Sequence, residues 1–94
     1  MYKFVLFVTG NQGNSTLARM NLKIICETHL DQPYEVREVD VLNDFQTALD
    51  RGILVTPSLI IESSEPKITI MGNLNDSSKL LNALGLPPKR EENG

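Results

Sequence analysis

The chain has 94 residues, of which 40% are hydrophobic and 22% charged, and its formal net charge is −3. A chain of this size has room for a single core, and its acidic and basic residues are mixed, which argues against the clustered basic surface that nucleic-acid binding requires. No apolar run approaches the ~20 residues of a membrane-spanning helix, and one cysteine cannot form an internal disulfide.

These features predict one domain over residues 1–88, followed by a disordered polar tail over residues 89–94. The first strand-like run begins so close to Met1 that no signal peptide fits before it. We therefore expect a cytoplasmic protein with no nucleic-acid or membrane partner.

The first half of the chain predicts a strand, a helix and a second strand. Residues 3–9 form a near-continuous β-prone run, typical of a central strand that is buried on both faces. After a turn over residues 10–14, Asn14 or Ser15 can cap a helix ending at Leu30, whose apolar positions recur at helical spacing: Leu17, Ala18, Leu22, Ile25 and Cys26. Valines alternate with charged residues over 35–41, which indicates a second, parallel strand.

The second half predicts a short helix, a hairpin and a last helix. Asn43 and Asp44 cap the short helix, and Gly52 ends it. Pro57 precedes the strand predicted over residues 58–62, because a proline is tolerated at a strand's start and lacks the N–H that a central position needs. Its bond to Thr56 is a candidate cis peptide. An antiparallel strand over residues 67–71 completes the hairpin.

The last helix begins at Asn75 or Asp76 and ends near Leu84, since Gly85, Leu86 and Pro87 supply a left-handed stop. We predict that Phe4, Phe45, Leu49 and the inner leucines of this helix belong to the core: Leu80, Leu81 and Leu84. Ile60, Ile68 and Ile70 alternate along the hairpin, and we expect one face of them to be exposed enough to support dimers or partner binding.

The order βαβ-α-ββα, with a proline opening the third strand, is similar to the thioredoxin-like fold, an α/β architecture with a mixed four-stranded sheet and flanking helices. In that fold the cis-proline loop faces the first β–α turn. Here that turn, residues 10–15, contains no cysteine and matches no phosphate-binding loop. We interpret it as a capped tight turn. The alternative is that it forms, with Pro57, a groove for an extended peptide.

Five segments resemble the KaiB family of circadian-clock adaptors. They are Phe7-Val8-Thr9-Gly10-Asn11 with Asn14-Ser15, Val39-Asp40-Val41-Leu42, Ile53-Leu54-Val55-Thr56-Pro57-Ser58-Leu59, Met71-Gly72-Asn73-Leu74, and Lys79-Leu80-Leu81. They occur in the family's order and at its spacing, from Phe4 to about Leu84. The resemblance implies a fold that can convert to an alternative, tetrameric one.

The resemblance also implies a binding protein without enzymatic activity or cofactor. Its partners would be a KaiC-like ATPase and a histidine kinase, the kinase competing with it for the ATPase. In the clock, KaiA would be a further partner. The process would be a rhythmic one or a stress response. The surface implied for partner binding carries Arg37, Glu38, Asp40 and Asp44. A homodimer or tetramer is possible.

Two departures from the family bear on the alternative fold. Family members poised to switch tend to carry glycine and aspartate where this chain has Ala83 and Gly85. Both residues favour the helical, thioredoxin-like C-terminal half. Leu17, Ile61 and Ile68 occupy positions where basic residues are common in the family, which points to a diverged partner.

Two other functions remain open. A thioredoxin- or glutaredoxin-type enzyme would need a cysteine in the first β–α turn, and a sensor module severed from a histidine kinase would share this fold. We expect Cys26 to be buried and inert, because a reactive thiolate needs a helix N-terminus or cationic neighbours. His29, near the end of the first helix, can interact with the helix dipole but supplies too few ligands for a metal site.

Overall fold

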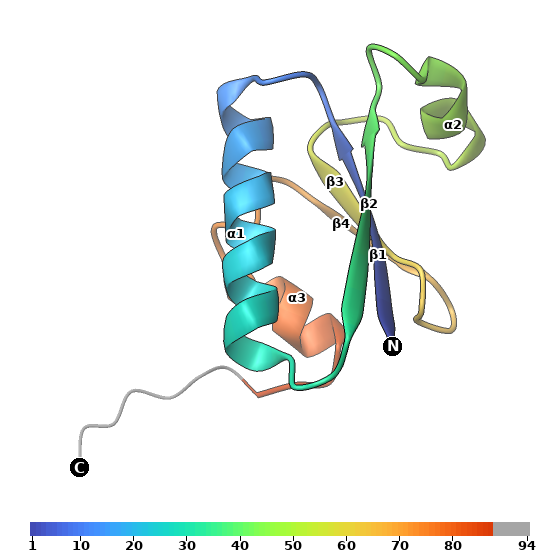
Figure 1. Cartoon of the computed structure of the whole chain (residues 1–94). Coiled ribbons are helices and arrows are strands. Elements are labelled where there is room, and N and C mark those ends of the chain that lie inside the picture. The colour runs from blue at the N-terminus through green and yellow to red at the C-terminus, as the bar shows by residue number, and fades with distance from the viewer. Residues whose placement is uncertain (88–94) are drawn as a thin grey trace.

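The computed structural model describes residues 1–87, and the predicted tail therefore lies outside the described residues. One mixed sheet has the strand order β2-β1-β3-β4, with β1 parallel to β2 and antiparallel to β3, and with β3 antiparallel to β4 (Figure 1). The strands are β1 Tyr2–Val8, β2 Tyr34–Asp40, β3 Ser58–Ile61 and β4 Ile68–Met71. The predicted strands, including the central position of the first one, are confirmed to within one residue at each end.

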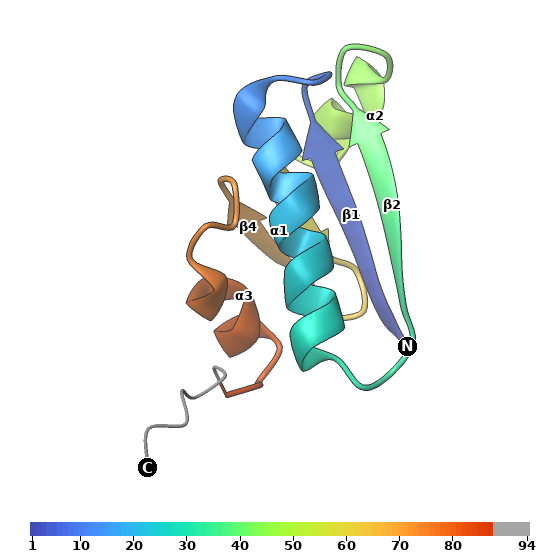
Figure 2. The ribbon, with the colours of Figure 1, turned by 60° about the vertical axis from the view of Figure 1, so that its left-hand side comes forward.

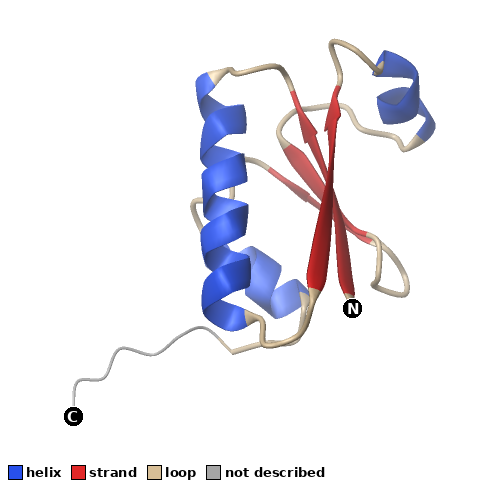
Figure 3. Ribbon diagram, viewed as in Figure 1, coloured by secondary structure: helices blue, strands red, loops and turns tan. Residues whose placement is uncertain are grey.

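Three helices flank the sheet: α1 Gly13–His29, α2 Phe45–Asp50 and α3 Ser77–Ala83. The long α1 and the shorter α3 cover one face, while α2 lies on the other face near the carboxyl end of β2 (Figures 1 and 2). Figure 3 shows the same layers by element type. This arrangement confirms the predicted α/β class with a mixed four-stranded sheet.

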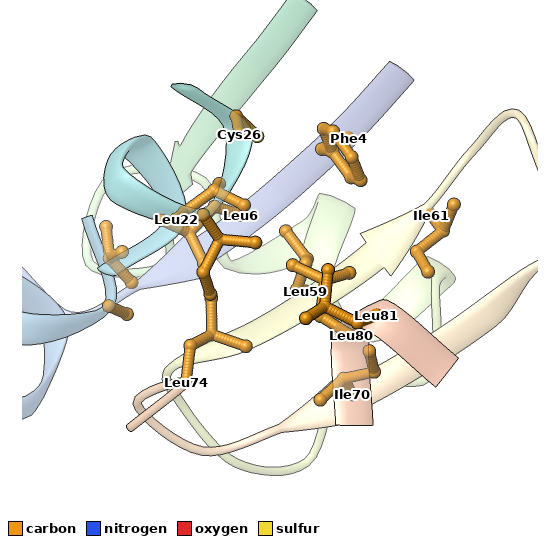
Figure 4. Packing of buried hydrophobic residues seen from close by; sticks show 13 residues of the cluster. Phe4, Leu6, Leu22, Cys26, Leu59, Ile61, Ile70, Leu74, Leu80 and Leu81 are labelled. Carbon is orange, nitrogen blue, oxygen red and sulfur yellow. The ribbon is translucent and has the colours of Figure 1, made fainter. Parts of the chain in front are cut away.

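The main core lies between the sheet and the pair α1 and α3. Thirteen buried hydrophobic residues form it, among them Phe4, Leu22, Leu59 and Leu80, which are at most 2% exposed (Figure 4). Burying one large aliphatic or aromatic side chain contributes about 1.5–3 kcal/mol. This face therefore holds most of the apolar burial that stabilises the fold.

A smaller cluster of six buried residues lies on the other face, under α2. Ala48 is the only buried residue of α2, and Phe7 and Ile60 contribute from the sheet beneath it. An ion pair joins Arg51, at the end of α2, to Glu62, just beyond β3. A helix of six residues thus covers only part of its face of the sheet.

The ends of the helices test the capping predictions. Asp44 accepts a hydrogen bond from the Thr47 N–H at the start of α2, and Asp76 accepts one from the Ser78 N–H at the start of α3. The predicted cap of α1 is wrong, because Gln12 occupies the N-cap without a side-chain bond and Ser15 is buried within the first turn. The Ser15 hydroxyl accepts the Thr9 N–H instead, at 3.0 Å, which ties the helix to the end of β1.

The predicted stop of the last helix is confirmed. Gly85 has φ +73°, and its N–H bonds to the Asn82 carbonyl while the Leu86 N–H bonds to the Leu81 carbonyl. These are the two hydrogen bonds of a Schellman motif, which needs a residue that tolerates the left-handed conformation. Ala83, the last residue of α3, packs partly buried against the main core.

Several predicted core assignments are wrong. Phe45 is 64% and Leu49 49% exposed, although Phe45 lies three residues before the buried Ala48. The hairpin isoleucines were predicted to have an exposed face, but they are more buried than expected. Ile60 and Ile70 are buried and Ile68 packs partly buried against the core, so they form no exposed face for dimers. Helical spacing identifies a face of a helix, but a neighbouring element must cover that face before its residues are buried.

Candidate partner-binding surface

A hollow lies opposite the cis-proline, where the alternative interpretation of the first β–α turn placed a groove. The Thr56–Pro57 bond is cis, and Pro57 is buried directly before β3. A hollow of about 670 Å³ separates residues 12–17 from Thr56 and Pro57, and the hydroxyls of Thr9 and Thr56 hydrogen-bond beside it. The side chains that line the hollow include no thiol and no ionisable group.

Cys26, the single cysteine, lies far along α1 from this groove and is buried in the main core. Burial, and to a lesser degree the nearby Glu27 carboxylate, raise the pKa of its thiol to about 11. The thiol therefore stays protonated at neutral pH, and the expectation of a buried cysteine is confirmed. Among residues 1–87, no three side chains of the kinds that bind metal ions are grouped as a site.

Glu38, one of the residues implied for partner binding, is engaged within the chain. The Arg19 Nε on α1 donates to the Glu38 carboxylate at 2.9 Å, and another guanidinium nitrogen donates to the Gly10 carbonyl at 2.8 Å. The bond to Glu38 is the main cause of a raised Arg19 pKa. Arg19 thus joins α1, the β1–α1 turn and the edge strand β2, so Glu38 helps to fix the turn.

Asp40 and Asp44 also act locally. The Asp40 carboxylate accepts the backbone N–H groups of Gly10 and Leu42, at 3.1 and 3.0 Å, and the residue is half-buried. Hydrogen bonds from the Thr47 hydroxyl and N–H lower the pKa of Asp44 at the cap of α2. Both carboxylates therefore shape the loop between β2 and α2.

Arg37 differs from these three carboxylates, because within residues 1–87 its side chain makes no hydrogen bond or ion pair. It is exposed on β2, and it lies close enough to Asp44 to lower the pKa of that carboxylate slightly. The structure therefore brings the free guanidinium of Arg37 to the base of α2.

Exposed apolar side chains occur on α2 and on the loops on either side of it. We call them the α2 patch; they are Leu42, Phe45, Leu49, Leu54 and Val55, with exposed fractions from 48% to 90%. Sequence reasoning assigned two of these residues to the core and left the others without a role. The available signal was the length of α2, since a six-residue helix that buries one alanine must leave its other apolar residues uncovered.

The fold and this surface define a thioredoxin-like domain whose first β–α turn lacks a redox cysteine. The N-terminal domain of SasA from Synechococcus elongatus has a TM-score of 0.75 at 19% identity, covering 96% of this chain and 89% of that one. Mitochondrial thioredoxin 3 from Saccharomyces cerevisiae has a TM-score of 0.70 at 15% identity, covering 90% of this chain and 78% of that one. At these identities both likenesses show the fold alone.

The sequence comparisons show the family. The family model for the KaiB domain matches residues 5–86. The circadian clock protein KaiB3 of Synechocystis sp. is 36% identical over 89% of this chain and 82% of its own length. The circadian clock oscillator protein KaiB of Picosynechococcus sp. is 39% identical over 90% of this chain and 82% of its own length. The chain belongs to the KaiB family, as its motifs indicated. None of the helices in the described part is long and apolar enough to cross a membrane.

Proposed function

We propose that this protein is a non-enzymatic adaptor that docks on a KaiC-like ATPase through the α2 patch and Arg37. The observation that carries the proposal is the group of exposed apolar side chains around α2, near the Arg37 guanidinium, which makes no ion pair within residues 1–87. Apolar patches of this kind on a small domain mark protein–protein contacts, and arginine beside aromatic residues is typical of the residues that dominate such contacts. Membership of the KaiB family supports an ATPase of the KaiC type as the partner.

Of the four charged residues that the resemblance implied for partner binding, we propose a direct contact for one. In our proposal Arg37 contacts the partner, while Glu38, Asp40 and Asp44 hold the loops that present the α2 patch. Substituting one of these three carboxylates would then weaken docking indirectly, together with a loss of stability. Substituting Arg37 would weaken docking without changing stability.

Size-exclusion chromatography with light scattering tests the proposal, with the KaiC-like ATPase encoded in the same genome and ATP. Co-elution of the wild-type chain is expected, with loss of the complex for Phe45→Ser and for Arg37→Glu. Met20→Ser is a matched control, because Met20 is 55% exposed on α1, on the opposite face of the sheet. Co-elution that survives Phe45→Ser and is lost with Met20→Ser would place the docking surface on α1 and refute the proposal.

A second proposal, on a different observation, is that a histidine kinase competes with this protein for the ATPase. The solved structure of the SasA N-terminal domain has the same fold with a TM-score of 0.75. A domain of this kind, acting apart from a kinase, would present the same surface and compete with the kinase for the ATPase. Adding the N-terminal domain of a SasA-like kinase to the chromatography above should then reduce co-elution as its concentration rises.

Redox enzymes of the thioredoxin and glutaredoxin types are the alternative from another class. The groove beside Pro57 contains no thiol, and the only cysteine is buried with a raised pKa, which supports a non-enzymatic protein. An insulin-reduction or glutathione-exchange assay provides the direct comparison. A rate that Cys26→Ser abolishes would favour the enzyme.

We further propose that residues 1–88 act as one domain in a cytoplasmic protein of clock or stress-response signalling, and that Ala83 and Gly85 keep the thioredoxin-like fold as its main state. Gly85 supports this because it supplies the left-handed residue that ends α3. NMR chemical shifts for residues 77–84 provide the test, since the alternative fold would give strand values there.

A further inference from the structure

β2 lies at the edge of the sheet, with no strand beyond it in the described part of the chain (Figures 1 and 2). The Val41 N–H bonds to the Val8 carbonyl, and the Pro33 carbonyl accepts the Tyr2 N–H. The backbone groups of the odd-numbered residues of β2 and its ends therefore point toward β1. Backbone groups alternate in direction along a strand. The N–H and C=O groups of Tyr34, Val36 and Glu38 therefore point outward, to an open edge that can accept a further strand.

The side chains along this edge are polar on one face and apolar on the other. On the face turned toward α2, Glu35 and Arg37 are exposed, and neither belongs to either of the two ion pairs of the described residues. On the α1 face, Val36 is 41% exposed and Tyr34 half-buried, beside a groove of about 260 Å³ whose floor includes Leu6 and Leu22. An added strand would thus meet two unpaired charges of opposite sign on one face and an uncovered apolar strip on the other.

We propose that the occupant of this edge is the β2 strand of a second copy of the chain, paired antiparallel about Val36. In this register Val36 faces Val36 of the second copy, and Tyr34 faces its Glu38. The backbone N–H and C=O groups of all these residues point outward from the sheet, so the residues form hydrogen-bonded pairs. Between them, Glu35 of each copy faces Arg37 of the other in the closely spaced, non-hydrogen-bonded positions, where cross-strand charge pairs are most effective.

Neighbouring registers are unfavourable because they oppose like charges. Centring the pairing on Glu35 places that glutamate against its own copy, and centring it on Arg37 or Glu38 does the same for those residues. Like charges directly opposite one another destabilise a sheet. If one strand shifts by a single residue relative to the other, a residue whose backbone groups point outward lies opposite one whose groups point toward β1. The hydrogen bonds between the two copies are then lost. Among the registers centred on residues 35–38, only the one about Val36 satisfies both conditions.

This inference does not depend on the proposed function. If both hold, the dimer covers Arg37, and the ATPase can dock only on the monomer. The dimer uses a surface different from the hairpin isoleucines considered in the sequence analysis, which are buried or partly buried.

Charge reversal combined with sedimentation analysis over a concentration series tests the register. The wild-type chain should form a reversible dimer, and Arg37→Glu or Glu35→Arg should each raise its dissociation constant by roughly tenfold or more, since each places two like-charged pairs in the interface. The double variant Glu35→Arg/Arg37→Glu should dimerise like wild type. An equimolar mixture of the two single variants should form a heterodimer, because every pair in it is then complementary.

Three outcomes would overturn the proposal. A wild-type chain that remains monomeric up to millimolar concentration would exclude the dimer. A double variant as defective as the single ones would exclude the register. Loss of the dimer on Phe45→Ser, with no effect of Arg37→Glu, would move the interface to the α2 patch. Circular-dichroism melting checks that each variant folds, which is expected because Glu35 and Arg37 are exposed.

Discussion

The two faces of the sheet differ in how completely they are covered. The face under α1 and α3 buries a cluster of thirteen hydrophobic residues, whereas the face under α2 buries six. Conversely, all five residues of the α2 patch belong to α2 or its adjoining loops. The difference indicates that the first face supplies most of the stability and that the second leaves apolar side chains available for a partner.

Shortening a leucine on each face gives the largest expected contrast. Leu80→Ala removes a side chain that is 0% exposed in the main core, which should lower the free energy of unfolding by about 2–5 kcal/mol. Leu49→Ala makes the same chemical change on a side chain that is 49% exposed, so its effect should stay within about 0.5 kcal/mol. Urea denaturation measures both. Equal losses would show that the α2 face is as important for stability as the α1 face.

Gly85→Ala should have the next largest effect, because it strains the stop of α3. A residue with a Cβ at φ +73° costs about 1–2 kcal/mol relative to glycine. Gly13→Ala is the matched control: Gly13 is the first residue of α1, and an added Cβ there meets no atom within 4 Å. The control should leave stability unchanged or raise it, so a similar loss in both variants would rule out backbone strain at Gly85.

Ala83→Gly probes the same helix through its propensity. Glycine in a helix costs about 1 kcal/mol relative to alanine, and Ala83 also packs partly against the core. Thermal unfolding should show the loss. If the alternative fold is accessible, NMR spectra of this variant should contain a second set of signals from residues 77–84. A loss of stability without a second set would separate helix propensity from fold switching.

The smallest effect is expected at Asp44, on the α2 face. Its folded-state pKa is lowered by hydrogen bonds from Thr47, so its stabilisation is present above the unfolded pKa of about 3.9 and is lost as pH falls through the folded value. Asp44→Asn keeps a capping oxygen but does not titrate. The melting temperature of the wild type should therefore fall by a few degrees more than that of the variant as the solution is acidified below pH ~4.

Most of the fold could be predicted from the sequence because its signals are local. The strand boundaries follow from β-prone runs between turns, the cis-proline from Pro57 at the start of a strand, and the end of α3 from Gly85. The exposure and local contacts of surface side chains were predicted less well. Arg37 was named, but Phe45 and Leu49 were assigned to the core, and Glu38 and Asp40 were named for partner binding although each is bound to groups within the chain.

The sequence by itself determined the order of the elements, the absence of a thiol from the first β–α turn, and the family, because each depends on residue types at fixed spacing. Only the tertiary structure decided which apolar faces are covered and which charges are already paired. The bond from Arg19 to Glu38 joins residues on separate elements, and the exposure of Phe45 reflects the small size of α2 and the lack of any neighbour over it in the described part of the chain. Such properties depend on how distant segments pack, and a local pattern of residues does not contain that information.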